Sequence, residues 1–245
     1  MRNLLRQFVL RSKRYLRTNK LTKGLYKDLY ALKEIPRKKR KHKNIDKAGF
    51  ELISTIHKIF KEADIMYFLD FGTLLGMVRE QGFIKHDLDI DIAVVINARV
   101  SSNLIKSIMA KNGFVLRYEY IFNNMNVEDS FLYKGVKVDI CYYTNNDQSS
   151  RCWLFYRKPD NNYEENYFNV VEFNYSKITK VKTIKIGNTE LQVPINAERV
   201  LKEKYGNNWS VPDKNWVYWK APNAKYCNEL GYRIVYNSTF AAPIN

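Results

Sequence analysis

The chain has 245 residues, 45% of them hydrophobic, which is enough to bury the core of one large domain or of a domain with an extension. The formal net charge is +16, but residues 1–47 hold 17 Lys or Arg against 3 acids, whereas residues 48–245 hold 24 against 22. The basic charge therefore belongs to an N-terminal arm. No apolar run exceeds about five residues, so the sequence predicts no helix that spans a membrane.

The expected location is cytoplasmic. Arg6 interrupts what would be the apolar core of a signal peptide, so export is not expected. Cys141, Cys152 and Cys227 form an odd count without metal-type spacing, which favours free thiols in a reducing compartment.

Residues 1–43 are predicted to form a basic amphipathic arm. Apolar residues recur at helical spacing in segments 4–9 and 25–32, and Pro36 is expected to end the helical run before a basic cluster at 37–43. This combination suits an anionic membrane surface at the inner face of the membrane. A solvated tail and a partner-binding helix are the alternatives. Nucleic acid is a less favoured partner, because no aromatic residue in the cluster would stack on bases.

Residues 44–245 are predicted to form one α+β domain, in which helices cover a central mixed sheet. Helices are expected at 46–62, 74–79, 99–111 and 197–204, the last capped by Asn196. Strands are expected at 65–69, 89–96, 114–122, 128–134, 136–143, 153–157, 167–175, 181–186 and 190–193. No element is predicted over 217–245.

Asp89 and Asp91 are the strongest candidates for chemistry. They lead into the unbroken apolar run Ile92–Ile96, which is typical of a central strand. Residues two apart face the same side of a strand, so both carboxylates project together. Carboxylates this close repel each other unless a cation lies between them, and hard oxygen ligands suit Mg²⁺, with Mn²⁺ as the alternative ion. The alternative interpretation is a surface hairpin that carries the same two acids without a function.

A phosphate site is predicted where the strand before Gly72 turns into a helix. Free N–H groups at a helix start attract an anion, and glycine leaves room for it. Thr73 would donate its hydroxyl and N–H to a phosphate or act as an ordinary N-cap. Arg79 would reach the phosphates bidentately from about two turns later, unless it is a surface arginine.

Three residues immediately before the paired acids are further candidates. Lys85 and His86 would neutralise charge on a phosphorylated donor, and His86 would also transfer a proton. Asp87 is expected to support the metal ligands rather than to bind the metal directly. Asp139 lies forty-eight positions after Asp91 in an apolar, β-branched setting, and the intervening chain is long enough to bring its strand back beside the first.

The amino-acid sequence of these segments resembles that of the LicD family, which belongs to the nucleotidyltransferase-fold superfamily. The resemblance is dense over residues 69–91 and has a second anchor, Tyr-Gly-x-x-Trp-x-x-Pro, at 205–212. The sequence departs from the bacterial members at Lys85, His86 and Leu88, where those have Pro-Trp and a further Asp. This departure bears on substrate identity more than on metal binding.

The resemblance implies a nucleotidyltransferase-type fold and a Mg²⁺-dependent phosphotransferase. The family includes phosphocholine transferases of bacterial surface glycans and fukutin-type ribitol-phosphate transferases. It implies a CDP-linked donor, a free or lipid-linked glycan acceptor and release of CMP. It also implies that Asp139 is the third carboxylate, which completes the metal site or takes the proton of the attacking hydroxyl.

Two other functions remain open at this point. The first is a nucleotidyltransferase that takes an NTP and releases pyrophosphate, because the same acids would serve it. The second is a polybasic membrane or nucleic-acid binding protein whose catalytic body is inert.

Overall fold

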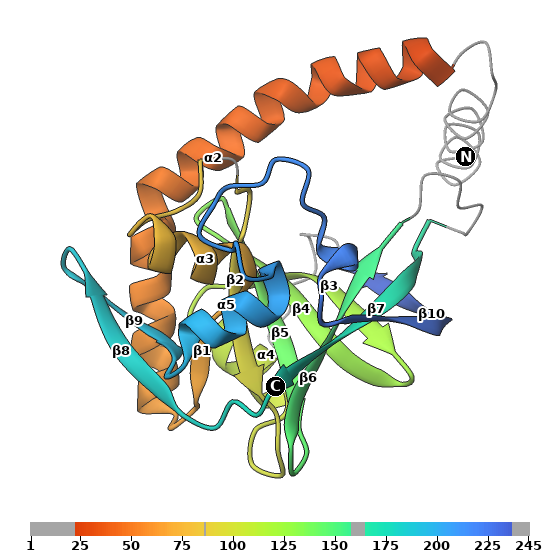
Figure 1. Ribbon diagram of the computed structural model, residues 1–245. Helices are drawn as coiled ribbons and strands as arrows, with labels where there is room; N and C mark the ends of the chain where they lie inside the picture. The colour runs from red at the N-terminus through yellow and green to blue at the C-terminus, as the bar shows by residue number, and fades with distance from the viewer. Residues whose placement is uncertain (1–22, 86, 158–164, 237–245) are drawn as a thin grey trace.

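The computed structural model describes residues 23–85, 87–157 and 165–236, and it confirms a mixed α+β architecture in which helices flank a large mixed sheet (Figure 1). The helices are α2 (Lys23–Glu62), α3 (Phe71–Arg79), α4 (Ser102–Lys111), α5 (Ala197–Tyr205) and the short 3₁₀ helix η1 (Tyr218–Lys220). The strands are β1 (Tyr67–Leu69), β2 (Ile90–Val95), β3 (Val115–Phe122), β4 (Met125–Tyr133), β5 (Val136–Asn145), β6 (Ser149–Tyr156), β7 (Tyr167–Ser176), β8 (Val181–Ile186), β9 (Thr189–Pro194) and β10 (Ala224–Val235). Residues 1–22 of the predicted arm and His86 lie outside the described residues.

Eight strands form the main sheet in the order β1-β2-β5-β4-β3-β10-β7-β6, and β8 pairs with β9 in a separate hairpin. β2 and β5 are parallel, and the other pairs are antiparallel. The last strand, β6, also pairs with the C-terminal end of β5 through Thr144 and Asn145. Six of the eight strands therefore close into a circuit, and β2 and β1 extend from it.

Helix α2 corrects the prediction that Pro36 ends the helical run. The helix is continuous over 40 residues with Pro36 inside it, so the helix expected to start at 46 is its C-terminal part. Proline removes one backbone hydrogen bond and clashes with the preceding turn, which bends a helix but does not always end it. Figure 1 shows the N-terminal half of α2 curving away from the body. The division into an arm at 1–43 and a domain at 44–245 stays a prediction.

Strand β10 and the short helix η1 both lie in residues 217–245, where the sequence predicted no element. Strand β10 pairs with β3 and β7, and its register shifts between Tyr226 and Leu230. Most of its side chains are exposed or half-buried, so it lacks the alternation of apolar and polar residues by which a strand is recognised. Tertiary pairing, not local hydrophobicity, defines this strand.

The parallel pair β2 and β5 holds the central part of the core. Ile92 and Ile140 face each other across the pair, and both are fully buried. Asp91 and Asp139 are also direct neighbours in this register, so both carboxylates lie on the opposite face of the two strands. The expectation that the strand of Asp139 returns beside that of Asp91 is confirmed. None of the helices in the described part of the chain combines the length and apolar character that a bilayer crossing needs.

Candidate active site

The three predicted carboxylates line one cavity of about 370 Å³. Asp91 lies on β2, Asp139 on the adjacent β5, and Asp89 immediately before β2. Gly72 and Asp87 border the same cavity. Six aromatic residues complete much of its wall: Phe71, Tyr120, Phe155, Tyr205, Trp216 and Tyr218.

A lysine lies between two of the carboxylates. The Lys137 ammonium is 3.1 Å from Asp89 Oδ2 and 2.5 Å from Asp139 Oδ2. The other oxygen of Asp139 accepts a hydrogen bond from the Ser130 hydroxyl of β4. Lys137 and Asp139 are two positions apart on β5, so they share one face of the strand, and Ser130 is directly opposite Asp139.

Burial and neighbouring charges raise the pKa of Asp91 and of Asp139. Asp91 has a pKa well above the usual range of an aspartate, first because it is buried and then because Asp89 and Asp139 repel its charge. Burial also raises the pKa of Asp139, although Lys137 opposes the shift. Burial works to lower the pKa of Lys137, but Asp139, Asp89 and Glu128 together raise it above its ordinary value. The described part of the cavity wall thus has more carboxyl groups than ammonium groups, which are those of Lys137 and Lys204.

The donor set suits a hard divalent cation. The oxygens of Asp89, Asp91 and Asp139 are the ligand type that Mg²⁺ prefers, and the Asp91 carboxylate accepts no hydrogen bond from any described residue. In the described ranges, no three His, Cys, Asp or Glu side chains are placed closely enough to surround an ion. The Lys137 ammonium lies between two of these carboxylates, so an ion bound by all three would require it to move.

Gly72 leaves room for the Asp87 carboxylate. A Cβ at this position would lie 2.9 Å from Asp87 Oδ2, which is too close for an ordinary contact. Helix α3 starts one residue earlier than Gly72, and its N-cap is Asp70, whose Oδ1 accepts from Phe71 N at 2.8 Å. The alternative in which Thr73 caps this helix is therefore wrong. The buried Thr73 hydroxyl accepts a hydrogen bond from Asp91 N at 2.9 Å and so ties α3 to β2.

The pKa of Asp87 is raised to about 7, first by burial and then by the charges of Asp89 and Glu80. The folded protein therefore holds this proton more tightly than the unfolded chain, where the pKa is 3.8. It follows that the free energy of unfolding of the metal-free protein decreases as pH rises from about 4 to about 7.

We expect Asp87→Asn to lose this part of the pH dependence. Urea unfolding between pH 4 and pH 8 should show similar stability at pH 4 and a growing advantage of the variant toward pH 8. Parallel curves for the two proteins would contradict the raised pKa of Asp87.

The other predicted site residues lie away from the cavity or outside the description. Arg79 pairs with Glu80 at 2.6 Å and does not border the cavity, although its charge lowers the pKa of Asp87. Lys85 is exposed and does not border it either. His86 lies outside the described residues. The phosphate-binding roles assigned to Thr73, Arg79, Lys85 and His86 stay predictions.

Three charged residues that border the cavity, Lys137, Glu128 and Lys204, were not singled out from the sequence. The spacing could have identified Lys137, because it lies two positions before Asp139 in a predicted strand and therefore on the same face. Glu128 lies two positions before Ser130 on β4, and burial raises its pKa. Lys204 carries no comparable pattern, since it reaches the cavity only when α5 packs beside α3.

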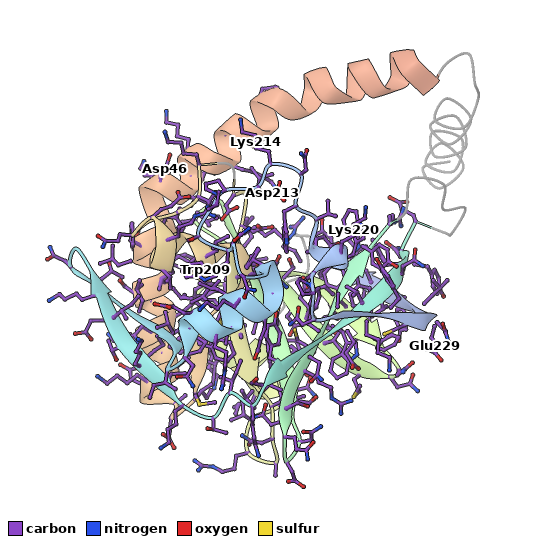
Figure 2. The ribbon with its side chains drawn as sticks, viewed as in Figure 1. Asp46, Trp209, Asp213, Lys214, Lys220 and Glu229 are labelled. Carbon is purple, nitrogen blue, oxygen red and sulfur yellow. The ribbon has the colours of Figure 1, made fainter. Side chains whose placement is uncertain are left out.

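The loop between α5 and η1 closes one side of the site region. Trp209, Asp213 and Lys214 mark its course in Figure 2, where Asp213 and Lys214 project into solvent. Tyr205, the first residue of the Tyr-Gly-x-x-Trp-x-x-Pro segment, borders the cavity together with Trp216 and Tyr218. Trp219 does not border the cavity and stacks on Tyr156 with the ring planes 14° apart.

Comparison with models of known protein families identifies the family of this chain. Residues 64–196, just over half of the chain, match the model of the LicD/FKTN/FKRP nucleotidyltransferase domain, and the chain belongs to this family. The matched region contains Gly72, the paired acids and Asp139, and it ends before α5. The resemblance read from the sequence is therefore confirmed.

The curated relatives are more distant. The chain is 22% identical over 180 residues to ribitol-5-phosphate transferase FKTN of Mus musculus, an alignment that covers 72% of this chain and 36% of the relative. It is 23% identical over 158 residues to an uncharacterised protein of Rickettsia typhi, covering 64% of this chain and 45% of the relative. An uncharacterised protein of Rickettsia prowazekii is 31% identical over 74 residues, covering 30% and 28%. The chain spans less than half the length of these relatives.

Proposed function

We propose that this chain is a Mg²⁺-dependent transferase with a nucleotidyltransferase-type catalytic domain. It would move a phospho-alcohol from a CDP-linked donor to a hydroxyl of a glycan and release CMP. The observation that carries the proposal is the in-register pair Asp91 and Asp139, which with Asp89 lines a cavity in a chain of the LicD/FKTN/FKRP family. The phospho-alcohol class comes from the similarity to the ribitol-5-phosphate transferase.

Asp89 and Asp91 would hold the metal, and Asp139 would complete its site. The ion supplies positive charge that neutralises the phosphate oxygens of the donor. Because Gly72 has no side chain, the Asp87 carboxylate can lie directly against the backbone at the start of α3. The aromatic wall limits the access of water to the reacting groups.

The proton of the attacking hydroxyl needs an acceptor in the cavity. Both oxygens of Asp139 already accept hydrogen bonds, from Ser130 and Lys137. Asp87 borders the cavity and has a pKa of about 7, close to the value that suits a general base at neutral pH. Asp87 is therefore the proposed base. The acceptor oxygen forms a bond to the phosphorus that bears the alcohol, and the bond from that phosphorus to CMP breaks.

Calorimetric titration with and without Mg²⁺ tests the proposal. The ligands are CDP-choline, CDP-glycerol, CDP-ribitol, CTP and ATP, and Asp89→Ala serves as the control that lacks one proposed metal ligand. We expect Mg²⁺-dependent binding that favours one CDP-alcohol and is lost in the variant. Preference for a triphosphate would instead favour nucleotidyl transfer. Binding of none of them would contradict both enzymes and favour an inert body with a basic arm.

A further inference from the structure

A buried lysine on α5 faces the same cavity and has no place in the chemistry described so far. Lys204 lies on the buried face of α5 with Ala197, Val200 and Leu201, where an apolar side chain would be expected. It is 2% exposed and borders the cavity, and it lies beyond the region that matches the family model.

The Lys204 ammonium is held between two aromatic rings. Its Nζ is 3.6 Å from the ring centroid of Phe71 and 3.7 Å from that of Phe173. Cation–π contacts of this kind stabilise a charge but supply no oxygen or nitrogen acceptor for its N–H groups. The Lys204 side chain is therefore fixed in position while its N–H groups remain available.

No described residue accepts a hydrogen bond from Lys204 Nζ. Asp70 attracts the ammonium through space but forms no ion pair with it in the described part of the chain. A buried charge without an acceptor is costly, and native structures rarely keep one without a reason. A ligand that brings its own acceptor oxygens would remove this cost.

Phe71 provides a second, independent observation. Its backbone φ is +44°, in the left-handed region that a bulky side chain rarely adopts. Strain of this kind persists where the surrounding structure requires it, and it gathers at ligand-binding sites. Here the strained residue starts α3, contributes one of the two rings that hold Lys204, and borders the cavity.

The charges that line the cavity indicate which ligand atoms Lys204 would meet. Lys137 directs two of its three N–H donors at Asp89 and Asp139, whereas Lys204, the other cation among the described residues that border the cavity, has no hydrogen-bond acceptor. We propose that Lys204 binds a phosphate group of the ligand. This inference deepens the proposed function and rests on it for the identity of the donor, but a phosphate probe tests it without a nucleotide.

The experiment compares Lys204→Met with Lys202→Met in the full chain. Lys202 is exposed on the same helix and does not border the carboxylate cavity, so it is a matched control. Each protein is titrated with inorganic pyrophosphate and with CDP in the presence of Mg²⁺, and thermal unfolding is recorded. We expect Lys204→Met to weaken both ligands by roughly 10- to 100-fold, the value of hydrogen bonds to a charged group, while Lys202→Met binds like the wild type.

Thermal unfolding separates this role from a structural one. Methionine fits between two rings and removes a buried charge, so Tm of Lys204→Met should be equal to or higher than that of the wild type. Wild-type affinity for pyrophosphate in a folded Lys204→Met protein would overturn the inference and leave the proposed function intact. Wild-type protein that binds pyrophosphate but no CDP compound would contradict the proposed function, and the pyrophosphate comparison would still decide the role of Lys204. If the wild type binds neither ligand, both are overturned.

A measurement on the wild-type protein covers the case in which the variant does not fold. In lysine-labelled protein, the rings of Phe71 and Phe173 should shift the side-chain NMR signal of Lys204 upfield, which distinguishes it from the exposed lysines. We expect this signal to move when pyrophosphate is added. A signal that stays in place while pyrophosphate binds would overturn the inference.

Discussion

Replacing Asp91 with asparagine is expected to reduce transfer by roughly a thousandfold or more and, at the same time, to stabilise the metal-free protein. The loss of activity follows because the substitution removes a proposed metal ligand that neighbours the other two, Asp89 and Asp139. The stabilisation follows because Asp91 is buried among Asp89, Asp139 and Asp87, all of which repel its charge. Tm at pH 8 without divalent cation should rise by roughly a few degrees.

Asp129→Asn is the matched control for this variant. Asp129 is a buried aspartate on β4, but its carboxylate accepts hydrogen bonds from Tyr142 and Asn126 and does not border the cavity. This variant should keep its turnover. Transfer at the wild-type rate by Asp91→Asn would refute the assignment of the site, and a large drop in its Tm would show that Asp91 supports the fold.

Replacing Lys137 with methionine should destabilise the metal-free protein, and Mg²⁺ should restore much of the loss. Lys137 is the cation that offsets Asp89 and Asp139, and removing one partner of a buried ion pair leaves uncompensated charge. The expected decrease in Tm is roughly 5–10 °C without a divalent cation. Mg²⁺ would then bind carboxylates that no longer share their charge with an ammonium, and its stabilising effect should exceed that in the wild type.

Lys106→Met provides the comparison. Lys106 forms a similar half-buried ion pair with Glu119 at 2.9 Å, away from the cavity. Its removal should also lower Tm, but Mg²⁺ should not restore it. Equal responses of the two variants to Mg²⁺ would show that the cavity carboxylates bind no divalent ion.

Local patterns predicted the elements that hold the carboxylates. The alternation of Asp89 and Asp91 with apolar residues, followed by a buried run, was sufficient to identify β2. The number of residues between Asp91 and Asp139 was sufficient to expect that β5 returns beside it, and the register brings the two into direct opposition. These features depend on residues that are close in sequence or on simple chain length.

Features that depend on packing between distant segments were not predicted. β10 has mostly exposed side chains and is defined by its pairing with β3 and β7. Lys204 appeared to be an ordinary helix-terminal lysine, because only tertiary structure places it between Phe71 and Phe173. The ion pair of Arg79 with its neighbour Glu80 was not predicted either, and the phosphate contact of Arg79 stays a prediction.

The parallel pairing of β2 and β5 has a consequence for folding. Asp91 and Asp139 are neighbours in space but lie forty-eight residues apart in sequence, so no short segment of the chain contains both of them. Non-local contacts of this kind form only after the entropy of closing the intervening loop has been lost, which slows folding. The mutual repulsion of the acids is added at that same step. Repulsion among the cavity carboxylates should therefore slow the pairing of β2 with β5, and a cation that screens these charges should accelerate it.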